Sequence, residues 1–209
     1  MTVALHLEVD RLALAGRLLV TGLRLTVPPG VAPTVMGPSG CGKSSLLAAI
    51  CGTLAPAFEV QARIALGAQR VEHLPAHARR IGILFQDDLL FAHMTVRENL
   101  LFAVPPAARA EREEAVRQAL HDLELPGYAD ADPATLSGGQ RTRVALMRAL
   151  LAQPRALLLD EPFARLDAAL RGRMREFVFG TLRRRGIPAL LVTHDEADVA
   201  DAAYLTRLG

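Results

Sequence analysis

The segment from Gly37 to Ser44 reads Gly-Pro-Ser-Gly-Cys-Gly-Lys-Ser and matches the pattern G-x-x-x-x-G-K-[ST] in full. Glycines at this spacing let the backbone curl until successive N–H groups point inward at a bound anion. We expect Lys43 to reach the β- and γ-phosphates of a nucleotide and the Ser44 hydroxyl to hold Mg²⁺. The residues expected at the phosphates are Gly37, Pro38, Ser39, Gly40, Cys41, Gly42, Lys43, Ser44 and Ser45.

Two carboxylates follow a later apolar run. Residues 156–159 are all apolar, and Asp160 and Glu161 come directly after them. A carboxylate at the carboxyl end of a strand beside the phosphate loop is where Mg²⁺ is held, so we assign Asp160 to the metal. Glu161 is then placed to polarise an attacking water. The simpler alternative is a solvated acid pair at the end of a strand.

A second candidate anion site lies between these two motifs. Leu136 is followed by Ser137, Gly138, Gly139 and Gln140, just where a helix is expected to begin. A serine and two glycines at a helix start expose backbone N–H groups that can bind an anion. A single nucleotide does not need two such helix N-termini from one chain.

The hydrophobic pattern predicts the elements that must position these motifs. Their order is that of an α/β sheet with a mostly helical insertion near 87–155. Strands are expected at 3–9, 18–27 (one or two), 31–36, 81–85, 156–160 and 189–193, with a small strand pair within 56–80, and helices at 45–51, 109–124, 139–152, 167–184 and 195–203.

A proline and a pair of histidines interrupt this pattern locally. Pro33 falls within the strand that leads into the phosphate loop, where proline is disfavoured, so we expect a bulge or a lost ladder hydrogen bond there. His73 and His77 are four residues apart, but Pro75 lies between them. We expect a solvated turn at these histidines rather than a metal site.

Composition limits the function classes. The chain has 209 residues, 51% of them hydrophobic, which is typical of one domain, or of one domain with a sizeable insertion. The 24 basic and 22 acidic residues nearly balance, so charge does not argue for nucleic-acid binding. Two cysteines indicate reduced intracellular thiols. No signal-peptide layout and no apolar run near the roughly 20 residues of a membrane span are present, so we expect a soluble protein with at most a peripheral membrane role.

Taken together, the motifs resemble those of an ABC-type ATPase cassette. The phosphate loop, Gln86, residues 136–140, Asp160-Glu161, Leu166-Asp167 and His194 occur in that family's order and rough spacing over essentially the whole chain. The resemblance implies a P-loop NTPase fold in one domain, residues 1–209. Residues 1–86 and 156–209 would form an α/β core with a central, mostly parallel sheet and an antiparallel β subdomain, and residues 87–155 the helical subdomain.

The resemblance also implies roles for individual residues. Two cassettes pair head to tail in this family, so Ser137, Gly138, Gly139 and Gln140 would face the γ-phosphate of ATP bound to the partner. Glu161 resembles the general base. His194 resembles the switch histidine at the γ-phosphate, and its alternative is a structural histidine. The remaining roles are Gln86 at the magnesium and the attacking water, Ser44 and Asp160 at Mg²⁺, and Asp167 either joining the two sites or capping the next helix.

Two departures from the family pattern stand out. The family usually stacks an aromatic ring on adenine from a turn before the phosphate loop, but the matching turn here is Leu14-Ala15-Gly16, and no aromatic residue precedes Phe58. Because a stacking contact of about 1 kcal/mol is then missing, we expect weaker ATP binding and looser base selectivity. Because the sequence stops at Gly209, soon after His194, we also expect no C-terminal regulatory domain of the kind that some relatives carry.

The resulting hypothesis is an ATP-hydrolysing subunit of a bacterial ABC transporter on the cytoplasmic face of the inner membrane. The resemblance favours an importer and implies a second cassette (a homodimer), transmembrane permease subunits, a solute-binding protein, ATP and Mg²⁺, and no nucleic acid. Residues 89–91 and Met94 would form the docking groove for a permease helix; their alternative is the core of the insertion. The alternative function is a soluble ABC-type ATPase that regulates a non-membrane partner. Residues 45–135 lack the heptads of chromosome-maintenance relatives, and a phosphate-loop kinase would not need residues 136–140.

Overall fold

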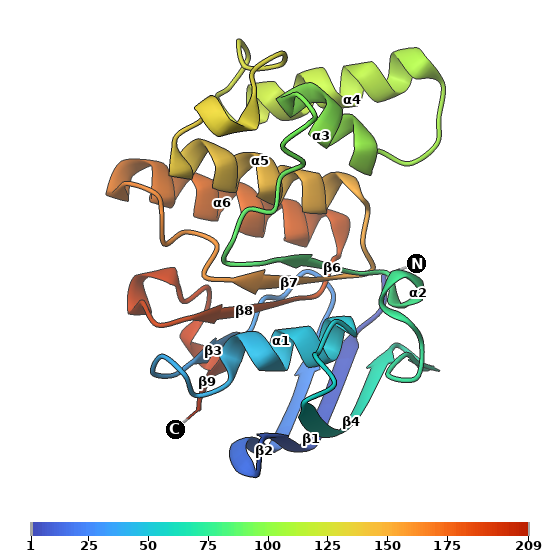
Figure 1. The fold of residues 1–209 in the computed structure, drawn as a ribbon, viewed down its shortest axis with the longest axis vertical. Helices are drawn as coiled ribbons and strands as arrows, with labels where there is room; N and C mark the ends of the chain where they lie inside the picture. Colours follow the sequence, from blue (N-terminus) through green and yellow to red (C-terminus); the bar gives the residue numbers. More distant parts are fainter. Residues whose placement is uncertain (1, 209) are drawn as a thin grey trace.

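The computed structural model describes residues 2–208, and its centre is a five-stranded parallel sheet (Figure 1). Successive side chains of its middle strands enter cores on opposite faces of the sheet, which is why these strands are apolar throughout. In spatial order the strands are β6 (Ile81–Leu84), β7 (Ala156–Asp160), β8 (Ala189–Thr193), β3 (Thr34–Met36) and β9 (Leu205–Arg207).

A second, antiparallel sheet has the order β2-β1-β4-β5. Helix α1 (Lys43–Cys51) lies between the two sheets (Figure 1), and its Leu46, Leu47 and Ile50 share one buried cluster with both of them. The phosphate loop precedes this helix, so the sandwich fixes the direction in which the loop points. The strands of the sheet are β2 (Arg17–Val27), β1 (Leu5–Leu14), β4 (Phe58–Leu66) and β5 (Gln69–Arg70).

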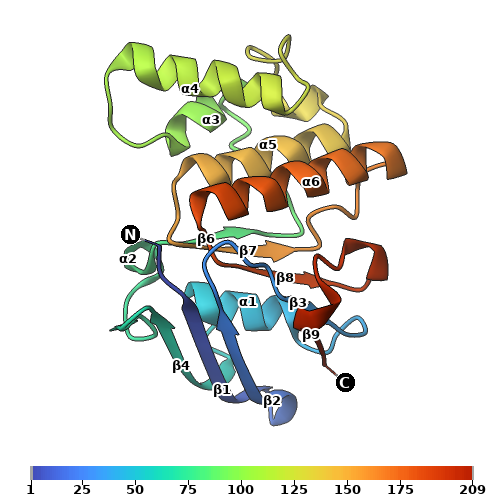
Figure 2. The ribbon, with the colours of Figure 1, turned by 180° about the vertical axis from the view of Figure 1, so that it is seen from behind.

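Helices α3 to α6 cover the opposite face of the parallel sheet (Figure 2), whereas the short helix α2 contacts the end of α1 through Arg79. Helices α5 and α6 lie against the sheet, and α3 and α4 stack on α5 farther out. Within residues 2–208, no helix is both long and apolar enough to cross a bilayer. The helices are α2 (Ala76–Arg79), α3 (Val96–Ala103), α4 (Arg109–Asp122), α5 (Gly138–Leu151) and α6 (Ala168–Arg185), and the 3₁₀ turns are η1 (Pro133–Thr135), η2 (Glu196–Asp198) and η3 (Ala202–Tyr204).

The parallel sheet, the antiparallel sheet and the helices confirm the predicted fold class, but the C-terminal prediction is wrong. Instead of one helix over 195–203, the chain forms the turns η2 and η3 and then strand β9. Asp195 and Asp201 accept hydrogen bonds from the N–H groups two residues ahead, at 2.9 Å each, and these local bonds compete with a continuous helix.

Two further differences concern the start of strand β3 and helix α3. Strand β3 begins just after Pro33, so the nitrogen that cannot donate lies at the start of the strand, and the Pro33 carbonyl still accepts from Leu191 at 3.0 Å; no bulge forms. Helix α3 was not predicted, although Thr95 and Glu98 form a reciprocal capping box at its start, which is a recognisable sequence signal. His73 and His77 are both exposed as expected, but only His73 lies in a turn, because His77 belongs to helix α2.

Gly172 offers a test of the helical backbone of α6. It is exposed within the helix, and a Cβ atom there would meet nothing within 4 Å. Gly172→Ala is therefore expected to raise the free energy of unfolding by about 1 kcal/mol, because it removes backbone freedom from the unfolded chain. Urea denaturation followed by circular dichroism measures the change.

Gly186 is the matched opposite case. It ends α6 at a φ of 61°, and a Cβ atom there would clash with Cγ2 of Thr2. Gly186→Ala is therefore expected to destabilise the protein. Equal effects of the two substitutions would contradict the helix geometry described here.

Candidate functional site

The phosphate loop connects β3 to α1 and has the backbone that its glycines permit. Gly40 and Gly42 have φ angles of 80° and 100°, in the left-handed region. A Cβ atom on Gly42 would also lie 2.9 Å from Cβ of Leu19, so no side chain fits there without a shift. The left-handed φ angles and the close approach of Leu19 keep the loop curled around the N-terminus of α1. This is the arrangement that binds phosphate.

Lys43 is the buried cation of this loop, with 7% of its surface exposed. Its Nζ atom donates to the carbonyl oxygens of Gly37 and Pro38 at 2.7 and 3.0 Å, which holds the side chain folded over the loop. The ammonium group therefore lies beside the inward-curling backbone rather than in solvent.

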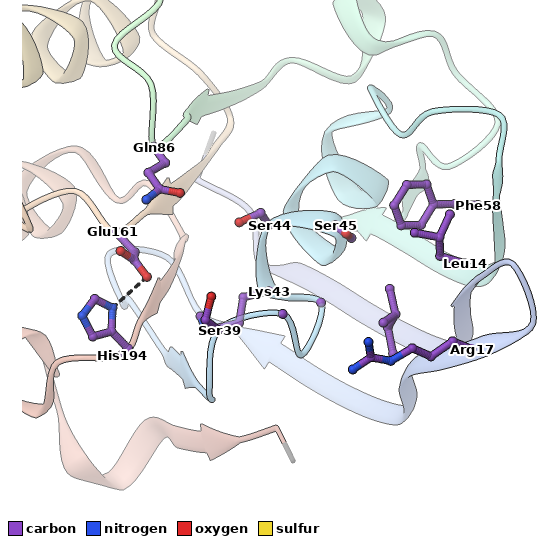
Figure 3. Close-up of a pocket in the computed structure, with 13 residues that line it drawn as sticks. Leu14, Arg17, Ser39, Lys43, Ser44, Ser45, Phe58, Gln86, Glu161 and His194 are labelled. Carbon is purple, nitrogen blue, oxygen red and sulfur yellow. Dashed lines mark hydrogen bonds and ion pairs between the residues drawn. The ribbon is translucent and has the colours of Figure 1, made fainter.

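A cavity of about 580 Å³ lies over the loop and α1 (Figure 3). Gln86, Glu161 and His194 stand at one end of it, although they come from three different strand ends. Of the predicted phosphate residues, Gly37, Pro38 and Cys41 do not line this cavity. Gly37 and Pro38 line a smaller cavity, and His194 lines both. The cavity is lined by Leu14, Arg17, Leu19, Ser39, Gly40, Gly42, Lys43, Ser44, Ser45, Phe58, Gln86, Glu161 and His194.

Asp160 ends strand β7 and is 4% exposed. Burial raises the pKa of its carboxyl group, the nearby Glu161 charge adds to this, and a hydrogen bond from the Ser44 hydroxyl and the charge of Lys43 oppose it. A buried carboxylate next to a hydroxyl suits a hard cation such as Mg²⁺. Within residues 2–208, no group of three His, Cys, Asp or Glu side chains could hold a metal alone.

Glu161 and His194 are in direct contact. Nδ1 of His194 lies 2.8 Å from Oε1 of Glu161, a hydrogen bond in which the ring N–H donates to the carboxylate. Glu161 has a φ of 48°, a strained conformation for a residue with a side chain, and its N–H is fixed by the carbonyl of Val192 at 2.9 Å. Strained backbone of this kind concentrates at functional sites. Figure 3 shows the Glu161 side chain at the end of the cavity near Gln86.

The second anion-binding motif does not reach this cavity. Ser137 caps α5 by accepting from the N–H of Gln140 at 3.2 Å, and Oε1 of Gln140 accepts from the N–H of Ser137 at 2.8 Å. Neither residue, nor Gly138 or Gly139, lines the cavity. The exposed start of α5 therefore has no ligand role within its own chain's cavity. Asp167, whose role was left open, caps α6 by accepting from the N–H of Leu170 at 3.0 Å.

Asp88 connects the site to the helical region, a link that motif reasoning missed. Its side chain is 8% exposed, and it accepts from Thr142 Oγ1 at 2.8 Å and from Arg165 Nη1 at 3.1 Å. Arg141 Nε lies 3.4 Å from the same carboxylate. The segment after Gln86 is thereby tied both to α5 and to the loop after Glu161. Arg141 and Arg165 lie 53 and 77 positions from Asp88, and no sequence pattern pairs residues that far apart.

Three comparisons place this geometry among known proteins. Residues 20–164 match the family model described as ABC transporter. The chain is 52% identical over 189 residues to the ABC transporter ATP-binding protein YnjD of Escherichia coli (strain K12), covering 90% of this chain and 87% of that protein.

Other relatives are longer. The chain is 40% identical to the Fe(3+) ions import ATP-binding protein FbpC 1 of Rhizobium meliloti (strain 1021), covering 85% of this chain and 50% of the relative. It is also 40% identical to the sulfate/thiosulfate import ATP-binding protein CysA of Synechocystis, over 87% of this chain and 51% of the relative. The chain thus spans about half the length of these import proteins.

Among solved structures, the fold matches a dimeric post-hydrolysis state of the ATP-binding cassette MJ0796 bound to ADP and Pi. The TM-score is 0.82 at 27% identity, over 98% of this chain and 94% of the other.

Proposed function

This chain belongs to the ABC transporter family as an ATP-hydrolysing cassette, and we propose that it powers import of a small solute by a bacterial ABC transporter. The observation that carries the proposal is the cavity that joins the phosphate loop to Gln86, Glu161 and His194. The relatives that are named for iron and sulfate import support the direction of transport. Residues 1–209 form one cassette in this proposal, with residues 87–155 as its helical subdomain.

In the proposed reaction, Lys43 and the loop N–H groups bind the β- and γ-phosphates. Ser44 and Asp160, with Gln86, would hold Mg²⁺, which supplies charge neutralisation at the phosphates when bound. A water oxygen forms a bond to the γ-phosphorus, the bond to the β–γ bridging oxygen breaks, and the water proton passes to the Glu161 carboxylate. His194 holds Glu161 through the hydrogen bond described above, and it would contact the γ-phosphate of bound ATP.

We propose a head-to-tail dimer of two copies of this chain. Residues 137–140 do not line their own chain's cavity. The capping box uses the N–H groups of Ser137 and Gln140, which leaves those of Gly138 and Gly139 for a partner's ATP. The MJ0796 cassette, which is similar over nearly all of this chain, is dimeric with ADP and Pi. Dimerisation would thus complete each of two sites, and the Asp88 contacts would link each site to the start of α5.

The permease subunits are proposed to dock in a second cavity, of about 440 Å³, between β6, α3 and α5. Leu89 and Phe91 line it, as expected from the sequence, but Leu90 packs into the core and Met94 does not line the cavity. Phe102, which is 65% exposed, lines it instead. The groove is largely apolar, although Asp87, Asp88 and Arg148 also line it. Such a groove suits a helix of a membrane subunit on the cytoplasmic face of the membrane. A solute-binding protein completes the proposed importer.

A pull-down of the tagged chain from its native host in mild detergent tests this proposal. We expect a polytopic membrane protein to copurify, and a variant carrying Leu89→Asp and Phe102→Asp to recover at least about tenfold less of it, because charges are costly in an apolar groove. Val60→Asp is the matched control, since Val60 is exposed on β4 and lines neither cavity.

Two results would contradict the proposal in different ways. Recovery of only ribosomes, nucleic acid or soluble proteins would move the chain to the soluble ATPases. Equal recovery by the groove variant and the control would leave the transporter function standing and refute the docking groove.

A further inference from the structure

The end of the nucleotide cavity farthest from Glu161 has a different chemistry from the rest. Leu14, Leu19 and Phe58 line it with apolar surface, and Arg17 is the charged residue beside them. Figure 3 shows the Phe58 ring next to Leu14 beyond Ser45, whereas Glu161 and His194 lie on the other side of Lys43. A molecule bound along this cavity would therefore have one end among phosphate-binding groups and the other against an aromatic ring.

Strand pairing explains how Phe58 comes to this place. Leu14 ends β1, Phe58 begins β4, and the two residues are direct partners in the antiparallel ladder. The N–H of Phe58 donates to the carbonyl of Ala55 at 3.1 Å, which fixes the entry into β4. The half-buried ring also packs against the cluster between the two sheets. Phe58 is therefore held at the cavity by backbone and core contacts rather than being free in solvent.

Arg17 lies on the other side of the turn that follows β1. Within residues 2–208 it forms no ion pair, and its side chain lines the cavity. A guanidinium group without an acidic partner can contact a phosphate or the face of an aromatic base. The apolar end of the cavity is thus bordered by one ring and one unpaired cation.

From this arrangement we propose that Phe58 is the base-contacting residue of the site, and that its ring and Leu14 bind the face of the nucleobase of ATP. The inference rests on the proposed nucleotide site and adds its base subsite. The sequence-based expectation of weak ATP binding assumed that no aromatic ring reaches the base. Phe58 reaches the cavity from β4, so this assumption does not hold, although no aromatic residue precedes the phosphate loop. Stacking uses the π-face that every purine has, so adenine and guanine are expected to bind with similar affinity.

The first test compares ligands with and without a base. Isothermal titration calorimetry of the full chain would measure binding of ATP and of inorganic tripolyphosphate, both with Mg²⁺. Phe58→Ala is expected to weaken ATP binding about tenfold and to leave tripolyphosphate binding unchanged, since only ATP carries a base. Phe58→Tyr keeps the ring and is expected to restore ATP affinity. Val60→Ala, on the same strand but outside the cavity, is the matched control.

A second test uses fluorescence, because the chain contains no tryptophan. In Phe58→Trp, ATP is expected to change the emission of the single tryptophan, and tripolyphosphate is not. In Val60→Trp, neither ligand should change it. The change in tryptophan emission reports contact with the base even if Phe58→Trp binds ATP with an altered affinity.

The outcomes separate the two proposals. If Lys43→Ala loses ATP binding but Phe58→Ala keeps it, the nucleotide site stands and the base subsite is refuted. If Phe58→Ala weakens ATP and tripolyphosphate equally, Phe58 acts only through the fold, and the base subsite is again refuted. If the unmodified chain binds neither ligand, the proposed function fails and the base subsite fails with it.

Discussion

Glu161→Gln is expected to lower the rate of ATP hydrolysis by about a hundredfold or more while leaving ATP binding intact. The amide has nearly the shape of the carboxylate but cannot accept the proton of the attacking water at neutral pH. The backbone of Glu161, fixed by Val192 and turned to a φ of 48°, does not depend on the charge of the side chain. The substitution should therefore remove the chemistry without removing the site.

The accompanying result is a change of oligomeric state. Because ATP would persist between two cassettes, Glu161→Gln should form a stable dimer in ATP that dissociates when ATP is removed. Phosphate release measures the first effect, and size-exclusion chromatography with and without ATP measures the second. Glu111→Gln, at an exposed position of α4, is the matched control and should behave like the unmodified chain. Normal hydrolysis by Glu161→Gln would refute the assignment of the general base.

The second large effect concerns the two halves of the proposed composite site. Lys43→Ala removes the buried cation from the phosphate loop, and Gly139→Asp places a negative charge at the start of α5. Each variant alone is expected to lose about a hundredfold or more of its ATPase activity, because charge stabilisation of the transferring phosphoryl group is lost or opposed. A Cβ atom on Gly139 would lie 3.2 Å from both the carbonyl oxygen of Arg165 and Cδ2 of Leu166, so the substitution also requires these neighbours to move slightly.

Mixing the two variants tests whether the site is shared between chains. In a mixed dimer, the intact phosphate loop of one chain faces the intact residues 137–140 of the other, so one of two sites is restored. An equimolar mixture should therefore recover about a quarter of the normal activity, if dimers exchange freely and sites act independently. A mixture that stays inactive would contradict the head-to-tail dimer. A mixture of Lys43→Ala with Glu161→Gln is the negative control, because both changes fall on the same half of the site.

The chemistry at the phosphates could be predicted from the sequence because each motif is local. The glycines of residues 37–42 set the loop conformation within a few residues, and the apolar run 156–159 predicts a strand that delivers Asp160 and Glu161 at its end. Long periodic helices such as α4 and α5 were predicted for the same reason. The residue roles that follow from these motifs stay predictions until the substitutions above are made.

The sequence alone thus determined the fold class, the phosphate loop and the position of two neighbouring carboxylates, Asp160 and Glu161, at the end of a strand. Only the tertiary structure decided which distant residues complete the cavity. Phe58 reaches it through the ladder between β1 and β4, and Asp88 meets Arg165 across 77 positions. Strand β9 forms because β3 has a free edge to pair with. Such contacts depend on the register and packing of elements far apart in the chain, and no local spacing or periodicity encodes them.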